Sequence, residues 1–174
     1  YFSNNGKLIS RKYVTMPDKI FTNYKDVRKS IVNLEAKPLF GYLCNSFYSL
    51  NVLPKNIWNF DLNLQVNEDF VMNMKIIEKI NCMVYMNYCG YHYNKRVATS
   101  LTTRRNDDYF KYSRIKIELL RNKYRKWNLY NENERMEILW LFIRIIFSAI
   151  ARTVKYSGYK QAKLLYINIC KDDL

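Results

Sequence analysis

Turn-forming residues are scarce in this chain, and this scarcity constrains its fold more than any other feature. The 174 residues include only 4 glycines and 3 prolines, while Lys, Asn and Ile are common. Because tight turns depend on glycine and proline, a β-sandwich with many turns is disfavoured and long helices are favoured. Hydrophobic residues make up 49% of the chain, so it can bury a core, and a disordered protein is excluded.

Apolar residues at helical spacing predict that most of the chain is helical. Asn23 is placed to cap a first helix, and Asn67 is placed to cap a later one. A helical segment is also expected between Pro38 and Pro54. The spacing of apolar residues predicts further helices over 67–80, 109–124, 132–155 and 160–169.

Short β-prone segments interrupt these helices. Residues 1–22 are compatible with an edge strand or a loop, and the apolar patch 57–62 is expected to be extended. Alternating residues predict a strand over 82–88, and 90–94 is expected to be a second strand or its edge. The expected fold class is therefore α+β and mostly helical.

The chain is strongly basic. Lys and Arg number 29 against 15 acidic residues, which gives a net charge of +14. Such a charge attracts anions, so nucleic acid, anionic lipid head groups and sugar-nucleotide phosphates are all candidate partners. A solvated basic surface without a specific partner is the remaining alternative. Because the chain has no helix-turn-helix, KH or RRM signature, nucleic acid is the least favoured of these partners.

The cysteines are too scattered for a zinc site. Cys44, Cys82, Cys89 and Cys170 contain no pair with CxxC spacing, and His92 is the only histidine. Scattered thiols are typical of proteins in a reducing cytoplasm. We therefore expect a cytoplasmic location, with peripheral contact to the inner face of the cell membrane as one option.

The most apolar stretch covers 138–151 and is shorter than the roughly 20 apolar residues that cross a bilayer. Two interpretations stay open. The stretch forms a core helix of a helical subdomain, or residues 138–155 form an interfacial helix on anionic lipid. In the second interpretation Arg144, Arg152 and Lys155 lie beside the apolar face.

Three short segments follow one another in a set order before residue 105. The first is GYLCNSFY at 41–48, with Phe-Asp following at 60–61. The second is NEDFVMN at 67–73, which places two acidic residues in the first turn of a predicted helix. The third is YHYNKR at 91–96, with Ser-Leu-Thr following at 100–102.

Together these segments resemble those of the bacterial family 2 glycosyltransferases, which are inverting enzymes of the GT-A type. The resemblance spans about residues 36–104. The first segment is similar to W-N-K-L-Y…F-D, with Cys44 in place of Trp and Ser46 in place of Lys. The second is similar to E-D-x-x-F/N. The third is similar to Y-x-Y-R-x-R…S-I-T, with Asn94 in place of the first Arg.

The resemblance implies transfer of a sugar from a nucleotide-diphosphate sugar to an acceptor hydroxyl. The acceptor would belong to a cell-surface polysaccharide or a lipid-linked precursor. Asp69 would be the general base that takes the hydroxyl proton, with Glu68 as its neighbour. Contacts to the substrate or its diphosphate are implied for Arg96, Asn45 and Tyr93. A guanidinium such as that of Arg96 can bind a diphosphate through two parallel hydrogen bonds.

The resemblance also bears on a metal ion and on the extent of the chain. His92 would join an Asp-x-Asp pair to hold Mg²⁺ or Mn²⁺ in the full-length enzyme, although a lone His between two tyrosines in a strand is more often a packed, hydrogen-bonded residue. No Asp-x-Asp pair occurs in the sequence. We therefore expect 1–104 to be the acceptor-side part of a GT-A domain and 105–174 to be a helical C-terminal extension.

A chain without the nucleotide-binding half is expected to bind nucleotide sugars poorly and to be inactive alone. The sheet edge that such a half would cover is expected to favour self-association. The alternative to a transferase is a basic helical module that binds nucleic acid or an anionic membrane surface without catalysis.

Overall fold

The computed structural model describes residues 2–4, 7–10, 16–53, 55–58, 64, 66–88, 90 and 105–172. The described residues are mostly helical and include two small antiparallel sheets, which confirms the α+β, mostly helical class. The chain divides into two compact units, Tyr1–Thr103 and Arg104–Leu174. This division adjoins the predicted boundary at residue 104. Among the described residues, no helix combines the length and apolarity needed to cross a membrane.

The strands of the first unit are short. β1 (Phe2–Asn4) pairs with β2 (Lys7–Ser10), and β3 (Lys19–Phe21) pairs with β4 (Met83–Tyr85), both antiparallel. Three strands therefore occur in the range 1–22, for which the sequence was compatible with either an edge strand or a loop. The strand predicted over 82–88 is confirmed only at its centre. The strand predicted over 90–94 lies outside the described residues except for its first residue.

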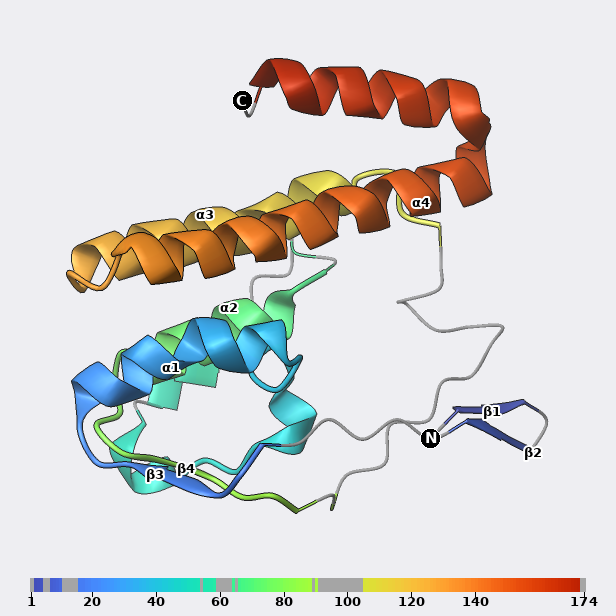
Figure 1. Ribbon diagram of the computed structural model, residues 1–174. Helices are drawn as coiled ribbons and strands as arrows, with labels where there is room; N and C mark the ends of the chain where they lie inside the picture. The colour runs from blue at the N-terminus through green and yellow to red at the C-terminus, as the bar shows by residue number, and fades with distance from the viewer. Residues whose placement is uncertain are drawn as a thin grey trace. The chain divides into compact units, whose positions relative to one another are not determined.

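Helix α1 (Tyr24–Ala36) begins with the cap that the sequence predicts. The backbone N–H of Asp26 donates to Asn23 Oδ1 at 2.9 Å, and Asn23 Nδ2 donates to Asp26 Oδ2 at 2.7 Å. The first bond pairs the Asp26 backbone N–H, which has no partner within the helix. One face of the helix is buried through Val27, Ile31, Val32 and Leu34. In Figure 1, α1 continues directly from β3, with which it is in contact.

Helix α2 (Glu68–Ile77) carries both acidic residues of the second segment in its first turn. The predicted side-chain cap is wrong. Asn67 has a left-handed backbone with φ of 67° and makes no capping hydrogen bond, whereas a capping Asn normally has an extended backbone. The helix also ends at Ile77, before the predicted Ile80. Six of its residues are buried: Phe70, Met72, Asn73, Met74, Ile76 and Ile77.

The segment between α1 and α2 differs from the prediction. Instead of one helix between Pro38 and Pro54, it contains two 3-10 helices, η1 (Leu43–Asn45) and η2 (Leu50–Val52). A third, η3 (Lys55–Trp58), replaces part of the extended patch predicted over 57–62; residues 59–62 lie outside the described part.

Exposure explains why a helix does not form between Pro38 and Pro54. Phe47 is 98% exposed and Leu50 is 70% exposed, although both belong to the apolar pattern that predicted the helix. Short helices depend on burial of one apolar face, and the apolar residues at helical spacing are not buried together here.

In the second unit, helices α3 (Tyr109–Lys126) and α4 (Glu132–Asp172) lie side by side (Figure 1). The turn between them is a Schellman motif. Leu129 N–H donates to the Tyr124 carbonyl at 2.9 Å, Asn128 N–H donates to the Arg125 carbonyl at 3.1 Å, and Asn128 has a φ of 54°. Asn131 Oδ1 then caps α4. The buried residues of this hairpin include Ile117, Leu120, Tyr124, Ile138, Leu141, Phe142 and Ala149.

Gly158 divides α4 into the two helices predicted over 132–155 and 160–169. Its backbone has a φ of 84° and a ψ of 171°, which is non-helical, and the segment after it turns back along the unit (Figure 1). This region of backbone conformation is accessible essentially to glycine alone.

Gly158→Ala is therefore expected to destabilise the second unit by about 1–3 kcal/mol. Space is not the limitation, since a Cβ built on Gly158 meets no atom within 4 Å. Urea unfolding followed by circular dichroism measures the change. The matched control is Ser157→Ala, at a helical position next to the kink, which should alter stability by no more than about 0.5 kcal/mol. Equal stability of both variants would contradict a strained turn.

Candidate active site

The carboxylate of Asp69 connects the first turn of α2 to the segment around η1. Its Oδ2 accepts a hydrogen bond from the backbone N–H of Leu43 at 3.2 Å. The two residues are 26 positions apart, so this bond brings the first predicted segment onto the second. A carboxylate can accept about four hydrogen bonds. The single hydrogen bond from a backbone N–H therefore leaves Asp69 able to accept a hydrogen bond from another donor.

A second contact between the same segments runs through Asn73, one turn after Asp69. The hydroxyl of Tyr48 donates to Asn73 Oδ1 at 2.6 Å, and Asn73 Nδ2 donates to the Phe40 carbonyl at 2.6 Å. Asn73 is only 4% exposed. Buried amides are stable only when their polar atoms are paired, so this one holds the segment 40–48 in a defined position.

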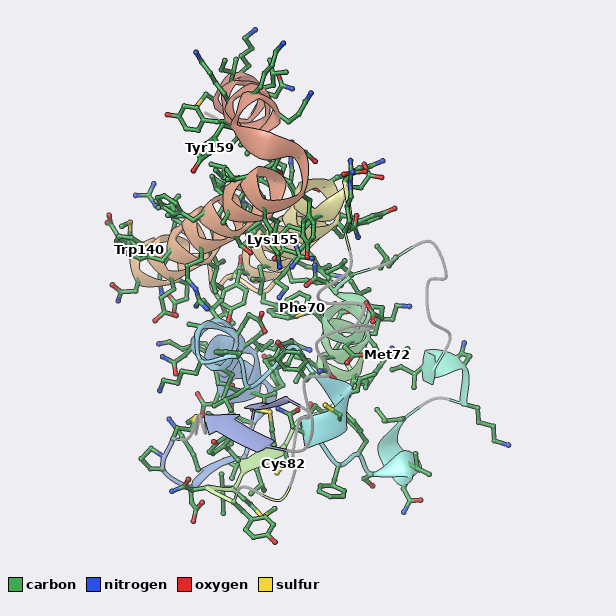
Figure 2. All side chains as sticks on the ribbon, turned by 90° about the vertical axis from the view of Figure 1, so that its right-hand side faces the viewer. Phe70, Met72, Cys82, Trp140, Lys155 and Tyr159 are labelled. Carbon is green, nitrogen blue, oxygen red and sulfur yellow. The ribbon has the colours of Figure 1, made fainter. Side chains whose placement is uncertain are left out.

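Apolar packing supports these polar contacts. The rings of Phe40 and Phe70 meet edge to face with their centroids 5.6 Å apart. A buried cluster of Leu53, Ile57, Met72 and Ile76 joins η2 and η3 to α2, and Leu43 and Tyr48 pack against it. Figure 2 labels Phe70 and Met72 on α2. Asp69 therefore lies at the edge of a packed core.

The structure places some of the predicted site residues and not others. Asp69 and Glu68 share the first turn of α2 and are both partly exposed. Asn45 is exposed on η1, where its Nδ2 donates to the Leu39 carbonyl at 3.1 Å. Asn45 is thus on the segment that Asp69 holds. The other three predicted residues, Arg96, Tyr93 and His92, lie outside the described residues, as does Asp61.

Tyr48 and Asn73 belong to the site and were not among the predicted site residues. Both were inside the segments that carry the resemblance. The signal for Asn73 was its position four residues after Asp69 and between Met72 and Met74, which both become buried. A polar residue at such a position requires a buried partner. Which residue supplies the partner is not visible from local sequence.

The environment of Tyr48 alters its acidity. Burial of the hydroxyl is the main cause that raises the pKa of Tyr48 above 10.0, and the negative charge of Asp69 raises the pKa further. The hydrogen bonds with Ser46 and Asn73 act in the opposite direction. The phenol is therefore neutral near pH 7 and available as a hydrogen-bond donor.

Tyr48→Phe is expected to destabilise the first unit by about 1–2 kcal/mol, because Asn73 Oδ1 loses its donor in a buried setting. Since the folded pKa of Tyr48 is raised, this contribution should be complete below pH 10 and decline as the pH rises through the folded pKa. The measurement is the difference in unfolding free energy between wild type and variant from pH 8 to 11. Taking the difference cancels the titration of the other tyrosines. A difference that grows above pH 10 would contradict the assignment.

No metal centre is visible in the described part of the chain. Within it, no group of three or more His, Cys, Asp or Glu side chains is arranged to hold an ion. The one predicted ligand, His92, is outside that part. The predicted Mg²⁺ or Mn²⁺ site therefore stays a prediction.

A shallow depression with a polar lining lies at the turn between α3 and α4. Arg125, Asn128, Tyr130 and Asn131 line it. Their polar groups serve the fold, since Asn131 caps α4 and the Arg125 guanidinium lies 5.1 Å from the Tyr130 ring centroid. The segment around Asp69 is therefore the better candidate for chemistry.

Comparison of the chain with protein-family models, with curated proteins and with solved structures found no match. The functional assignment thus depends on the residues and their geometry.

Proposed function

We propose that this chain is the acceptor-side part of an inverting glycosyltransferase and that Asp69 is its general base. The enzyme would transfer a sugar from a nucleotide-diphosphate sugar to an acceptor hydroxyl in cell-surface polysaccharide or glycolipid synthesis. The observation that carries the proposal is the hydrogen bond between Leu43 N–H and Asp69 Oδ2, which joins two of the three segments that resemble this family.

The chemistry needs a carboxylate that is ionised, partly exposed and held in place. Asp69 is in the first turn of α2, where the helix dipole favours a negative charge. It is accessible to solvent, so an acceptor hydroxyl can approach it. The acceptor oxygen attacks the anomeric carbon, and the bond between that carbon and the nucleotide diphosphate breaks. The hydroxyl proton passes to the Asp69 carboxylate.

Positioning comes from the residues around Asp69. The Leu43 N–H holds one carboxylate oxygen, while Tyr48 and Asn73 hold the segment that carries Asn45. A general base must lie within hydrogen-bond reach of the proton that it removes, so a fixed carboxylate favours catalysis over a mobile one. Asn45 is exposed on this segment and would contact the acceptor or the donor phosphates.

The proposal is tested by joining the chain to its nucleotide-binding half. We expect the reading frame directly upstream to encode a β-α-β nucleotide fold that ends in Asp-x-Asp. A polypeptide with both parts should release UDP from a UDP-sugar in the presence of acceptor and Mg²⁺ or Mn²⁺, and the 174-residue chain alone should not. An unrelated upstream domain, or equal UDP release without residues 1–104, would overturn the proposal.

A further inference from the structure

Helix α4 has a second apolar face besides the one that packs on α3. Ile138, Phe142 and Ala149 are buried, with at most 5% of each side chain exposed. A further set is exposed: Met136 by 39%, Trp140 by 59% and Phe147 by 70%. Because these three residues are four and seven positions apart, they lie along one side of the helix. We call them the outer stripe.

The outer stripe is unusual for a surface that faces water. A helix that packs on one neighbour normally carries polar residues on its opposite side, and a helix that is apolar all round is normally covered. Trp140 is large and amphipathic, and Figure 2 shows it on the outside of α4. The stripe therefore indicates an apolar partner.

The charge of the same region identifies the kind of partner. Apart from Glu137, which lies near the start of the stripe, the sequence contains no acidic residue from residue 136 to residue 171. Arg144 and Lys155 are exposed and lie about 60–80° around the helix from the centre of the stripe, on its flank. The basic residues of this region are Arg144, Arg152, Lys155, Lys160, Lys163 and Lys171.

We propose that the outer stripe of α4 binds an anionic membrane surface, with the helix lying in the plane of the interface. A cationic helix with Trp and Phe on its apolar side combines burial of those side chains with attraction to anionic head groups. A second copy of the chain is the less suitable occupant, because each copy carries a net charge of +14 and the two would repel. This surface lies in the second unit and does not depend on the proposed transferase activity.

Vesicle binding by the 174-residue chain tests the proposal. We expect it to sediment with phosphatidylglycerol–phosphatidylcholine vesicles and to bind pure phosphatidylcholine vesicles at least about tenfold more weakly, since the basic flank requires anionic lipid. Trp140→Glu combined with Phe147→Glu should reduce binding to the anionic vesicles at least about tenfold, because it places negative charges on the side of α4 that would enter the membrane. Raising the salt concentration should weaken the wild-type interaction.

Phe47→Glu is the matched control, since Phe47 is 98% exposed in the other unit. It should leave vesicle binding unchanged. Circular dichroism and thermal unfolding should show that all variants keep the wild-type helix content. If the double variant loses helix content, Trp140→Ser alone replaces it, since that side chain is more than half exposed.

Tryptophan fluorescence gives a second readout that needs no substitution in the stripe. With Trp58 and Trp127 replaced by Phe, the emission comes from Trp140 alone. Its maximum should move to shorter wavelength on anionic vesicles, and lipids brominated near the head group should quench it. An unchanged Trp140 spectrum, or equal binding to neutral vesicles, would overturn the proposal. So would a concentration-dependent dimer that Trp140→Glu dissociates, because the stripe would then be occupied by a second copy.

Discussion

Asp69→Asn is expected to lower sugar transfer at least about 100-fold in a polypeptide that joins this chain to a nucleotide-binding half, because the proposed general base would contribute roughly 10²–10⁴-fold. The substitution is conservative for the fold. The asparagine side-chain oxygen can still accept the hydrogen bond from Leu43 N–H, which the carboxylate accepts at 3.2 Å. Binding of the nucleotide sugar should persist. The measurements are initial rates of UDP release and donor affinity by calorimetry.

Asp69→Ala separates the proposed role of this carboxylate as a general base from its observed hydrogen bond with Leu43 N–H. It removes both the base and the acceptor for Leu43 N–H, so we expect the same loss of activity plus a loss of stability of about 1 kcal/mol. Asp69→Asn should lose the activity alone. If Asp69→Asn retains wild-type turnover, Asp69 is only a structural contact between α2 and η1. If both variants lose stability equally, the Leu43 contact does not depend on the side-chain oxygen.

Phe70→Ala should have the largest effect on stability, a loss of about 3–5 kcal/mol, which is typical of a fully buried Phe reduced to Ala. Phe70 is 0% exposed and stacks edge to face on Phe40, whose carbonyl accepts the hydrogen bond from Asn73. The cavity would therefore loosen the segment that Asn73 and Tyr48 hold beside Asp69. Urea unfolding of the chain gives the stability change.

Phe47→Ala supplies the control for this prediction with the same chemical change at a surface position. Phe47 is 98% exposed, so its removal should change stability by no more than about 0.5 kcal/mol. Comparable losses in the two variants would mean that Phe70 is not part of a packed core. A loss confined to Phe70→Ala would support the arrangement of α2 around the site.

Local sequence predicted those helices whose signals are contained within a few turns. Asn23 caps α1 through Asp26, three residues away, and the Gly158 kink separates two segments whose apolar patterns each predict a helix. The two helices predicted over 109–124 and 132–155 were found for the same reason, but local sequence did not predict that they pack on each other. Helical periodicity and caps act between residues three to four positions apart, so they can be read without knowing the fold.

The segment between α1 and α2 was predicted wrongly because its structure depends on distant residues. Its apolar spacing is helical, but the chain places Leu43 and Tyr48 against α2 and leaves Phe47 in solvent. Asn67 shows the same effect at the start of α2. It has the residue type of a cap, and the path of the chain gives it a left-handed backbone instead. Tertiary packing overrides local propensity at such positions.

For the candidate site, the sequence by itself determined that Asp69 and Glu68 begin a helix and that Asn45 and Tyr48 precede it in a polar, aromatic segment. Only the tertiary structure decided that these parts meet. The contacts that join them, Leu43 with Asp69 and Tyr48 with Asn73, span 26 and 25 residues. Hydrogen bonds over such separations form only when burial of the apolar cluster around Met72 and Ile76 brings the segments together, and burial is a property of the whole fold.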